Sequence, residues 1–187
     1  MRGKQRRAVA RVLNHPLTVS QIWKQAREQA PKLQLRDVWF ILRQLEERDL
    51  VQCFNPSLLN GKVFFWTERG RTVVEAALGK TVSPTIVENL NWNRYGKVAR
   101  ASVRRRVLEE ISRPSLPEQR GKCVSEIRRQ LLDKTPMELS RAIRAVKELS
   151  HLKLIRPAGY TPKPKRKLYE LTPAGRRVVE TLKRQTG

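Results

Sequence analysis

The feature of this sequence that most constrains its fold is an internal repeat. Residues 67–75, TERGRTVVE, return 105 residues later as residues 172–180, TPAGRRVVE, with six of the nine positions identical. The segments VSQI at 19–22 and VSEI at 124–127 lie at the same offset. The chain therefore contains two copies of one unit of roughly 75 residues.

Each copy is expected to form three helices, a β-hairpin and a closing helix, in that order. In the first copy, Thr18 and Gln21 have the spacing of a capping box, which predicts the start of the second helix. Turn dipeptides, Asn55-Pro56 and Asn60-Gly61, mark the loop of the first hairpin. The expected helices are 6–13, 18–29 and 35–48, then 103–112, 124–132 and 139–149. The expected strands are 50–54 and 62–67, then 153–156 and 167–172.

This order predicts an α+β fold, mainly α with small β-hairpins, divided into two domains. The first domain is expected over residues 1–78 and the second over 103–187, joined by a partly helical linker at 79–102. An apolar stripe runs from the linker into the second copy, on one side of a helix that can continue between them. Its members are Trp92, Tyr95, Ala99, Val103, Val107 and Ile111. The stripe packs either on its own domains or against a second chain in a homodimer.

The order of helices and strands resembles that of winged helix-turn-helix transcription regulators, especially the basic archaeal type. The residues that carry the resemblance are VWFILRQLEERDLV at 38–51, GKVF at 61–64, and the Thr-x-x-Gly-Arg patterns that begin at Thr67 and Thr172. The resemblance implies two tandem winged-helix domains, in which each third helix enters the major groove. Asp49 and Lys153 stand where the family usually carries glycine after the third helix, although Asp tolerates the left-handed region better than most residues.

The net charge is +23, from 40 Lys and Arg against 17 Asp and Glu. Like charges in such excess repel one another and destabilise the compact chain, so this charge indicates a partner of opposite charge. Nucleic acid is the first expectation, and an anionic membrane surface is the second. Residues 1–93 carry 15 basic and 8 acidic side chains, whereas residues 94–187 carry 25 and 9. The apolar runs are too short to span a membrane, no signal peptide is evident, and two cysteines make no disulfide framework. We therefore expect a cytoplasmic, nucleoid-associated protein.

The outer faces of the two third helices follow from a rotation of about 100° per residue. The expected inward residues are Leu35, Val38, Leu42 and Leu45 in the first copy, and Leu139, Ala142, Val146 and Leu149 in the second. In the first copy, Phe40 then points outward between Arg36 and Arg43. Phe40 suits contact with a thymine methyl group or with a partner protein.

In the second copy, Arg144 takes the place of Phe40, beside Arg141 and Lys147. Arginine bonds guanine bidentately, so Arg144 and Arg141 are the expected base contacts. Four cations interleaved with prolines make the second wing suitable for phosphates or the minor groove: Lys163, Lys165, Arg166 and Lys167. The first wing offers only Lys62, at its base, and Ser125 near a helix N-terminus suits a phosphate or a capping role.

Nothing in the sequence points to catalysis or to a cofactor. His15 and His151 have no cysteine or carboxylate at ligand spacing, so no metal site is expected, and there is no Gly-rich phosphate loop or nucleophile motif. Phe64 and Trp66, and their counterparts Tyr169 and Leu171, are interpreted as core residues. We expect a monomeric transcription regulator that binds double-stranded DNA. The alternatives are an architectural chromatin protein and a protein that binds RNA hairpins.

Overall fold

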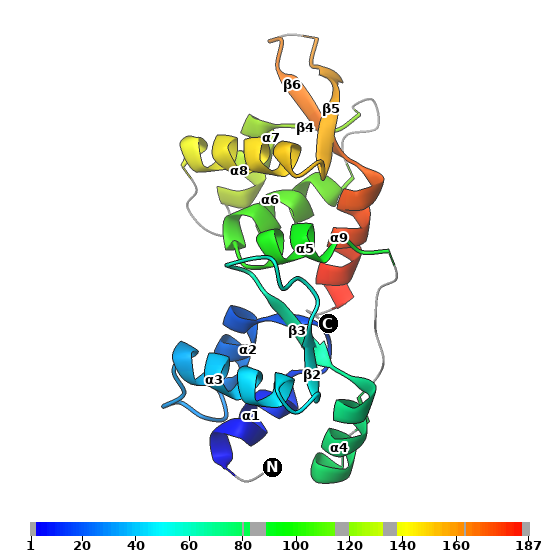
Figure 1. The fold of residues 1–187 in the computed structure, drawn as a ribbon. Coiled ribbons are helices and arrows are strands. Elements are labelled where there is room, and N and C mark those ends of the chain that lie inside the picture. The colour runs from blue at the N-terminus through cyan, green and yellow to red at the C-terminus, as the bar shows by residue number, and fades with distance from the viewer. Residues whose placement is uncertain are drawn as a thin grey trace. The chain divides into compact units, whose positions relative to one another are not determined.

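The computed structural model describes residues 3–79, 81–82, 89–114, 120–132, 138–162 and 164–184. The chain divides into two compact units, unit 1 (Met1–Arg100) and unit 2 (Ala101–Gly187), which are described separately. Unit 1 contains α1 (Lys4–Val12), β1 (Leu17–Thr18), α2 (Val19–Ala26), α3 (Leu35–Glu46), β2 (Val51–Cys53), β3 (Val63–Trp66), α4 (Glu68–Leu78) and α5 (Trp92–Ala99) (Figure 1). Unit 2 contains α6 (Ser102–Ser112), β4 (Lys122–Cys123), α7 (Val124–Leu132), α8 (Leu139–His151), β5 (Ile155–Tyr160), β6 (Lys167–Leu171) and α9 (Pro173–Arg184).

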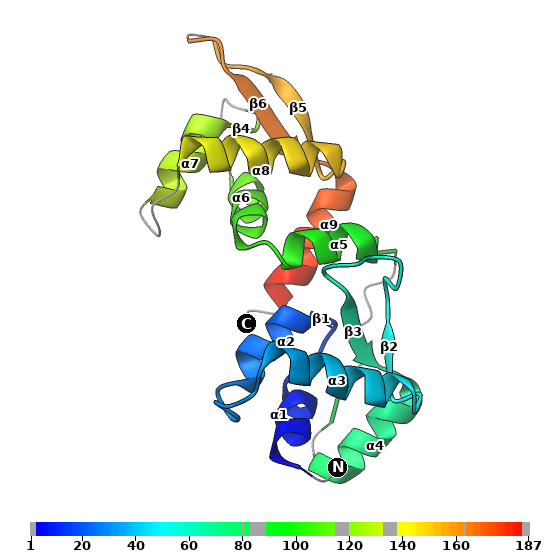
Figure 2. The same ribbon diagram turned by 60° about the vertical axis from the view of Figure 1, so that its left-hand side comes forward.

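Each unit contains a three-stranded antiparallel sheet whose central strand comes last in the chain. The strand orders are β1-β3-β2 in unit 1 and β4-β6-β5 in unit 2. The predicted α+β class is confirmed, and in each unit three helices precede the hairpin (Figure 2). The two-residue strands β1 and β4 are not predicted from the sequence, because a period-2 pattern cannot be recognised over two positions.

The start of α2 confirms the predicted capping box. The Gln21 amide donates to Thr18 Oγ1 at 3.4 Å, and Gln21 Oε1 accepts from the Thr18 amide at 2.9 Å. Two backbone donors that the first turn leaves without helical partners are thereby satisfied. A cap of this kind contributes about 1 kcal/mol to stability.

The chain leaves α3 and α8 through the same left-handed turn. The φ angles are 54° at Asp49 and 56° at Lys153. In unit 1 the Leu50 amide donates to Leu45 O at 2.8 Å, and the equivalent bond in unit 2 measures 3.0 Å. Glycine adopts this helix-ending geometry without strain, whereas other residues pay roughly 1–2 kcal/mol. Both turns are therefore left-handed although neither contains glycine at this position.

The repeated Thr-x-x-Gly pattern fastens this turn to the helix that follows the hairpin. Thr67 Oγ1 donates to Asp49 O at 2.7 Å and accepts from the Gly70 amide at 2.9 Å. A Cβ on Gly70 would lie 1.8 Å from Leu50 O, and a Cβ on Gly175 meets the equivalent carbonyl of unit 2 at 2.0 Å. The Thr-x-x-Gly pattern occurs in both units because in each the glycine lies against a backbone carbonyl, which leaves no room for a side chain.

The strand β3 lies at the centre of the unit 1 core. All four of its residues are buried, which confirms Phe64 and Trp66 as core residues, and Trp39 packs edge-on against Phe64 at 5.9 Å between ring centroids. In β6 only Leu168 is buried. The prediction that Tyr169 and Leu171 are core residues is wrong, because both side chains are only half-buried.

Unit 2 buries an ion pair where unit 1 buries a leucine. Lys122 of β4 is 3% exposed, and its Nζ donates to Glu110 Oε1 at 2.7 Å and to Gln130 Oε1 at 3.1 Å. Glu110 is 2% exposed and also accepts from Arg113 Nη1 at 2.7 Å. The position of Lys122 in the repeat corresponds to Leu17 in β1, which is fully buried.

The apolar stripe from Trp92 to Ile111 is divided between two helices. The helix is interrupted between Ala99 and Ser102, so α5 and α6 are separate helices and do not form the continuous helix that was expected. Tyr95, in unit 1, is fully buried, and Val107 and Ile111, in unit 2, are buried as well. Tyr95, Ala99, Val107 and Ile111, four of the six members of the stripe, are thus buried within the single chain.

Candidate nucleic-acid interface

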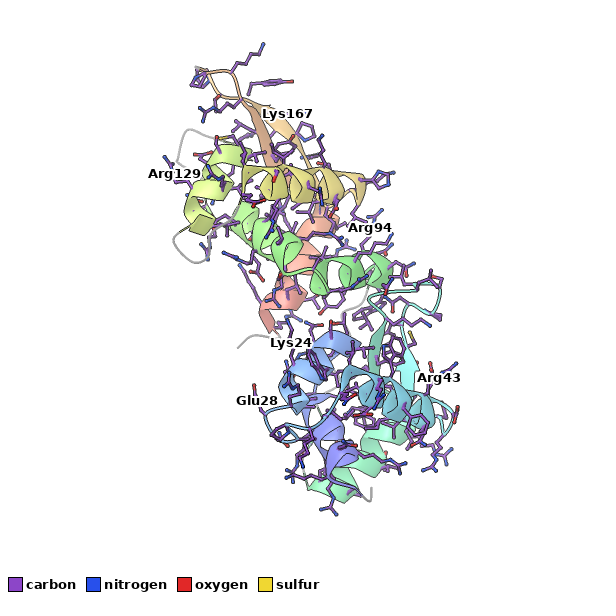
Figure 3. The ribbon with its side chains drawn as sticks, turned by 90° about the vertical axis from the view of Figure 1, so that its left-hand side faces the viewer. Lys24, Glu28, Arg43, Arg94, Arg129 and Lys167 are labelled. Carbon is purple, nitrogen blue, oxygen red and sulfur yellow. The ribbon has the colours of Figure 1, made fainter. Side chains whose placement is uncertain are left out.

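The outer face of α3 carries the three residues predicted for it. Phe40 is 63% exposed, the Arg36 side chain is 82% exposed, and Arg43 is exposed on the same helix (Figure 3). The inner face consists of Val38, Ile41, Leu42 and Leu45. The prediction that Leu35 points inward is wrong, because this first residue of the helix is 42% exposed and extends past the core.

The outer face of α8 is cationic. Arg141, Arg144 and Lys147 are all exposed, as predicted. The inner face consists of Ala142, Ala145, Val146 and Leu149. Leu139 is 45% exposed, so its predicted inward position is wrong for the same reason as that of Leu35: both residues begin their helices.

Two carboxylates border the cationic face of α8 and leave it positive. Glu138 Oε2 lies 3.5 Å from Arg141 Nε, but both side chains are at least 65% exposed, so the pair contributes at most about 1 kcal/mol. Glu148 accepts a hydrogen bond from Arg104 of α6, which neutralises this carboxylate and joins α8 to α6. Arg144 and Lys147 are exposed on the same helix.

The hairpin of unit 2 presents cations where β5 and β6 are connected, in a segment that includes the last residue of β5 and the first of β6 and that we call loop 2 (residues 160–167). Its exposed cations are Lys165, Arg166 and Lys167, the last of which is labelled in Figure 3. Lys163, also predicted for this surface, lies outside the described residues. Lys165 Nζ lies 5.3 Å from the ring centroid of Tyr160, which is 57% exposed, so an aromatic ring accompanies the cations.

Arg166 joins loop 2 to the start of α7. Its Nη1 donates to Ser125 Oγ at 2.8 Å, across 41 residues of sequence. The loop closes on itself beside this contact, because the Arg166 amide donates to Thr161 Oγ1 at 2.8 Å and the Thr161 amide donates to Arg166 O at 2.9 Å. Two of the predicted contact residues, Ser125 and Arg166, are therefore brought together from separate elements.

The hairpin loop of unit 1, which we call loop 1 (residues 54–62), is held by a buried amide. Asn55 is 2% exposed, and its Oδ1 accepts from the Val63 amide at 2.7 Å. Its Nδ2 donates to Gly61 O at 3.0 Å and to Trp92 O at 3.3 Å. One side chain thus closes the loop and attaches it to α5.

Loop 1 also packs directly against α5. The rings of Phe54 and Trp92 stack at 4.6 Å between centroids with planes 14° apart. A Cβ on Gly96 would lie 2.2 Å from Gly61 O, and a Cβ on Gly61 would lie 2.7 Å from Gly96 O. The two backbones are therefore in contact, and one side of loop 1 is covered by protein.

Lys62, the one cation predicted to contact DNA from this hairpin, is half-buried. Its Nζ lies 6.0 Å from the ring centroid of Trp39 on α3. The exposed residues of loop 1, which are Pro56, Ser57, Leu59 and Asn60, carry no charge. Loop 1 accordingly lacks the cationic surface that loop 2 presents.

A cationic stripe on α1 was not predicted from the sequence. Lys4, Arg7 and Arg11 are exposed and follow one another at intervals of three and four residues, so they share one face of the helix. Two open grooves flank them, with volumes of about 880 and 430 Å³. The spacing of these cations was the signal in the sequence that identifies this face.

The described part of the chain shows no arrangement suited to metal binding. It contains no group of three or more His, Cys, Asp or Glu side chains that could hold an ion. Burial lowers the pKa of His15 and raises the pKa of the Cys53 thiol, so both groups favour their neutral forms. Of the helices described, none has the length and hydropathy needed to cross a membrane.

Comparison with known proteins adds no functional assignment. No protein-family model matches the chain. A search of curated proteins also finds no match.

Proposed function

We propose that this protein is a tandem winged helix-turn-helix transcription regulator that binds double-stranded DNA. In this proposal units 1 and 2 are its two winged-helix domains, α3 and α8 enter the major groove, and loop 2 is a wing that contacts phosphates or the minor groove. One observation carries the proposal: unit 2 combines three exposed cations on one face of α8 with a cationic loop that Arg166 joins to α7. A net charge of +23 supports an anionic partner of this kind.

The proposal extends to a monomer without catalytic activity or cofactor, associated with the nucleoid in the cytoplasm. The apolar stripe was expected either to pack on its own domains or to form a homodimer interface; Tyr95, Ala99, Val107 and Ile111 are buried within the single chain, which favours the monomer. The outer faces of α3 and α8 differ in their residues, so one chain should cover an asymmetric site of roughly 15–20 base pairs.

The test begins with selection of binding sites from random duplex DNA by the full chain. Affinity is then measured by fluorescence anisotropy for the selected duplex, a scrambled duplex and an RNA hairpin over a range of salt concentrations. The selected duplex should bind about 10³-fold or more tightly than the scrambled one. About eight phosphate contacts should give a slope of log K against log salt near −7.

The other two functions predict different outcomes in the same experiment. Equal affinity for selected and scrambled duplexes would indicate an architectural DNA-binding protein, a function that the high charge and the proline-lysine pattern of loop 2 also suit. Preference for the RNA hairpin at equal salt would indicate an RNA-binding protein. A slope shallower than about −3 would contradict a footprint made by two units.

The role of α8 is tested by Arg144→Ala, with Arg176→Ala on the exposed face of α9 as a charge-matched control. Loss of a bidentate contact to guanine should weaken binding to the selected duplex by about 1–3 kcal/mol and leave the scrambled duplex nearly unaffected. The control should alter neither. If Arg144→Ala weakened both duplexes equally, Arg144 would not read a base.

A further inference from the structure

We propose that the exposed face of α1, together with the groove between α1 and α3, forms a second surface on unit 1 that binds the sugar-phosphate backbone of DNA. This proposal rests on the DNA-binding function above and assigns to α1 the role that a wing has in unit 2. It follows from the shape of the groove, from its charge and from the surroundings of loop 1.

The larger groove lies between the start of α1 and the first half of α3. Its lining residues are Gly3, Lys4, Gln5 and Arg6 on one side and Arg36, Asp37, Phe40 and Ile41 on the other. Arg6 Nη2 donates to Gln44 Oε1 at 2.6 Å, a contact that holds the first turn of α1 beside α3. The groove therefore opens onto the same face of α3 that carries Arg36 and Phe40.

The charge of this groove is positive. Lys4, Arg6 and Arg36 line it, against the single carboxylate of Asp37. That carboxylate accepts from the Gln34 amide at 2.9 Å in the cap of α3 and lies 3.9 Å from Arg36 Nε, so it offsets one of the three cations and leaves the groove positive. The smaller groove continues the positive surface along α1 with Lys4, Arg7 and Arg11. Steps of three and four residues space these cations by about 4.5 and 6 Å along the helix axis.

A DNA backbone fits this surface better than an acidic peptide, because the surface adjoins the helix proposed to enter the major groove. The major groove is about 12 Å wide, and a helix with its side chains is about 10–12 Å across. A helix that fills the groove brings the protein on either side of it against a row of phosphates. The first turn of α1 lies at that position beside α3.

Loop 1 cannot supply these contacts in unit 1. Its exposed residues carry no charge, Lys62 lies over Trp39, and α5 covers its Gly61 side. Unit 1 nevertheless needs backbone contacts to fix the register of α3, because base contacts alone do not position a protein on a duplex. The cations of α1 meet this requirement.

The experiment compares two double variants of the full chain that remove the same charge. Lys4→Ala/Arg7→Ala removes two cations from the proposed surface, and Lys32→Ala/Arg69→Ala removes two exposed cations of unit 1 outside both grooves. Alanine is the best helix former, so the first variant retains α1. Each variant is titrated with the selected duplex over a range of salt, and its unfolding is followed by circular dichroism.

Loss of two phosphate contacts should make the salt slope of Lys4→Ala/Arg7→Ala shallower by about 1.8, while the control changes it by less than about 0.5. Equal changes in the two variants, or no change in the first, would overturn the proposal while leaving DNA binding by the chain established. Loss of binding to a polyglutamate peptide with unchanged duplex binding would assign the surface to an acidic protein instead. Failure of the unmodified chain to bind any duplex would overturn the proposed function itself.

Discussion

The two hairpins of this chain share one topology and have opposite surroundings. Loop 1 carries no exposed charge, is closed by the buried amide of Asn55, and lies against α5. Loop 2 carries exposed cations, and a hydrogen bond from Arg166 to Ser125 joins it to α7. The same fold thus positions both hairpins, while the residues of each loop decide whether it packs against protein or presents cations to solvent.

The same contrast extends to the sheets. At equivalent positions, β1 places the apolar Leu17 and β4 places Lys122 into the interior. Leu17 contributes by burial alone, whereas Lys122 requires Glu110, Gln130 and the carbonyl of residue 110 to satisfy its three donors. We therefore expect the stability of unit 2 to depend on Glu110, the charged partner of Lys122, whereas Leu17 in unit 1 needs no such partner.

The largest expected effect is on unit 2. Glu110→Leu leaves the buried ammonium of Lys122 without its carboxylate, which should lower the free energy of unfolding of unit 2 by roughly 3–5 kcal/mol. All four tryptophans lie in unit 1, so the fluorescence transition reports that unit alone and should keep its midpoint. Circular dichroism, which reports both units, should show the earlier loss of unit 2.

A control for this prediction replaces both members of the ion pair. Glu110→Leu combined with Lys122→Leu restores the apolar character that Leu17 has in β1, and it should recover much of the lost stability. A single variant as stable as the unmodified chain would show that the ion pair does not hold unit 2 together.

The next effect compares the two loops directly. Lys165→Ala/Lys167→Ala should make the salt slope of DNA binding shallower by about 1.8 and weaken all duplexes about 30-fold at 0.15 M salt, because phosphate contacts carry no sequence information. Lys62→Ala in loop 1 should change the slope by less than about 0.5. Anisotropy titrations of the two variants measure both values. A larger effect from Lys62 would reverse the assignment of the two loops.

A smaller effect concerns the contact between loop 1 and α5. Gly96→Ala places a methyl group 2.2 Å from Gly61 O, so the loop and the helix must separate. The gain in helix propensity of about 1 kcal/mol does not offset such overlap, and we expect a net destabilisation of roughly 1–2 kcal/mol. Trp92 lies at this contact, so tryptophan fluorescence reports the change.

The matched control is Asn93→Ala, an exposed position on the same helix. It brings a smaller gain in helix propensity without overlap and should leave the stability of unit 1 unchanged or slightly raised. Equal stability of the two variants would mean that loop 1 is not packed against α5.

The smallest effect concerns the left-handed turns after α3 and α8. Lys153→Gly removes the strain of a positive φ and should raise stability by up to about 1 kcal/mol. Asp49→Gly should gain less, because Asp visits this region more readily than Lys. Thermal unfolding of both variants tests the ranking. Destabilisation by Lys153→Gly would show that the lysine side chain itself contributes to this turn.

The frame of both units follows from local signals in the sequence. The capping box at Thr18 starts α2, the Thr-x-x-Gly patterns mark the close approach after each hairpin, and the helical period places Phe40 and Arg144 on outer faces. Each of these signals acts over a few residues, so it can be recognised without knowledge of the fold. The helical period wrongly predicts that Leu35 and Leu139 point inward, because the first turn of each helix extends beyond the core.

The features that distinguish the two units depend on contacts between distant segments. Asn55 meets Trp92 across 37 residues, and Arg166 meets Ser125 across 41. Asn55 looks like an ordinary turn residue in the sequence, and Lys122 looks like one more surface cation. Neither pattern indicates burial, because the partners that satisfy these side chains are defined only by the folded chain.

The assignment of surfaces is tested most directly by lysine footprinting of the full chain with the selected duplex. Acetylation rates of individual lysines are measured by mass spectrometry with and without DNA. The duplex should slow acetylation at Lys147, Lys165 and Lys167 in unit 2 and at Lys4 in unit 1, and it should leave Lys62 in loop 1 unchanged. Protection of Lys62 with unchanged reactivity at Lys147, Lys165 and Lys167 would contradict the account.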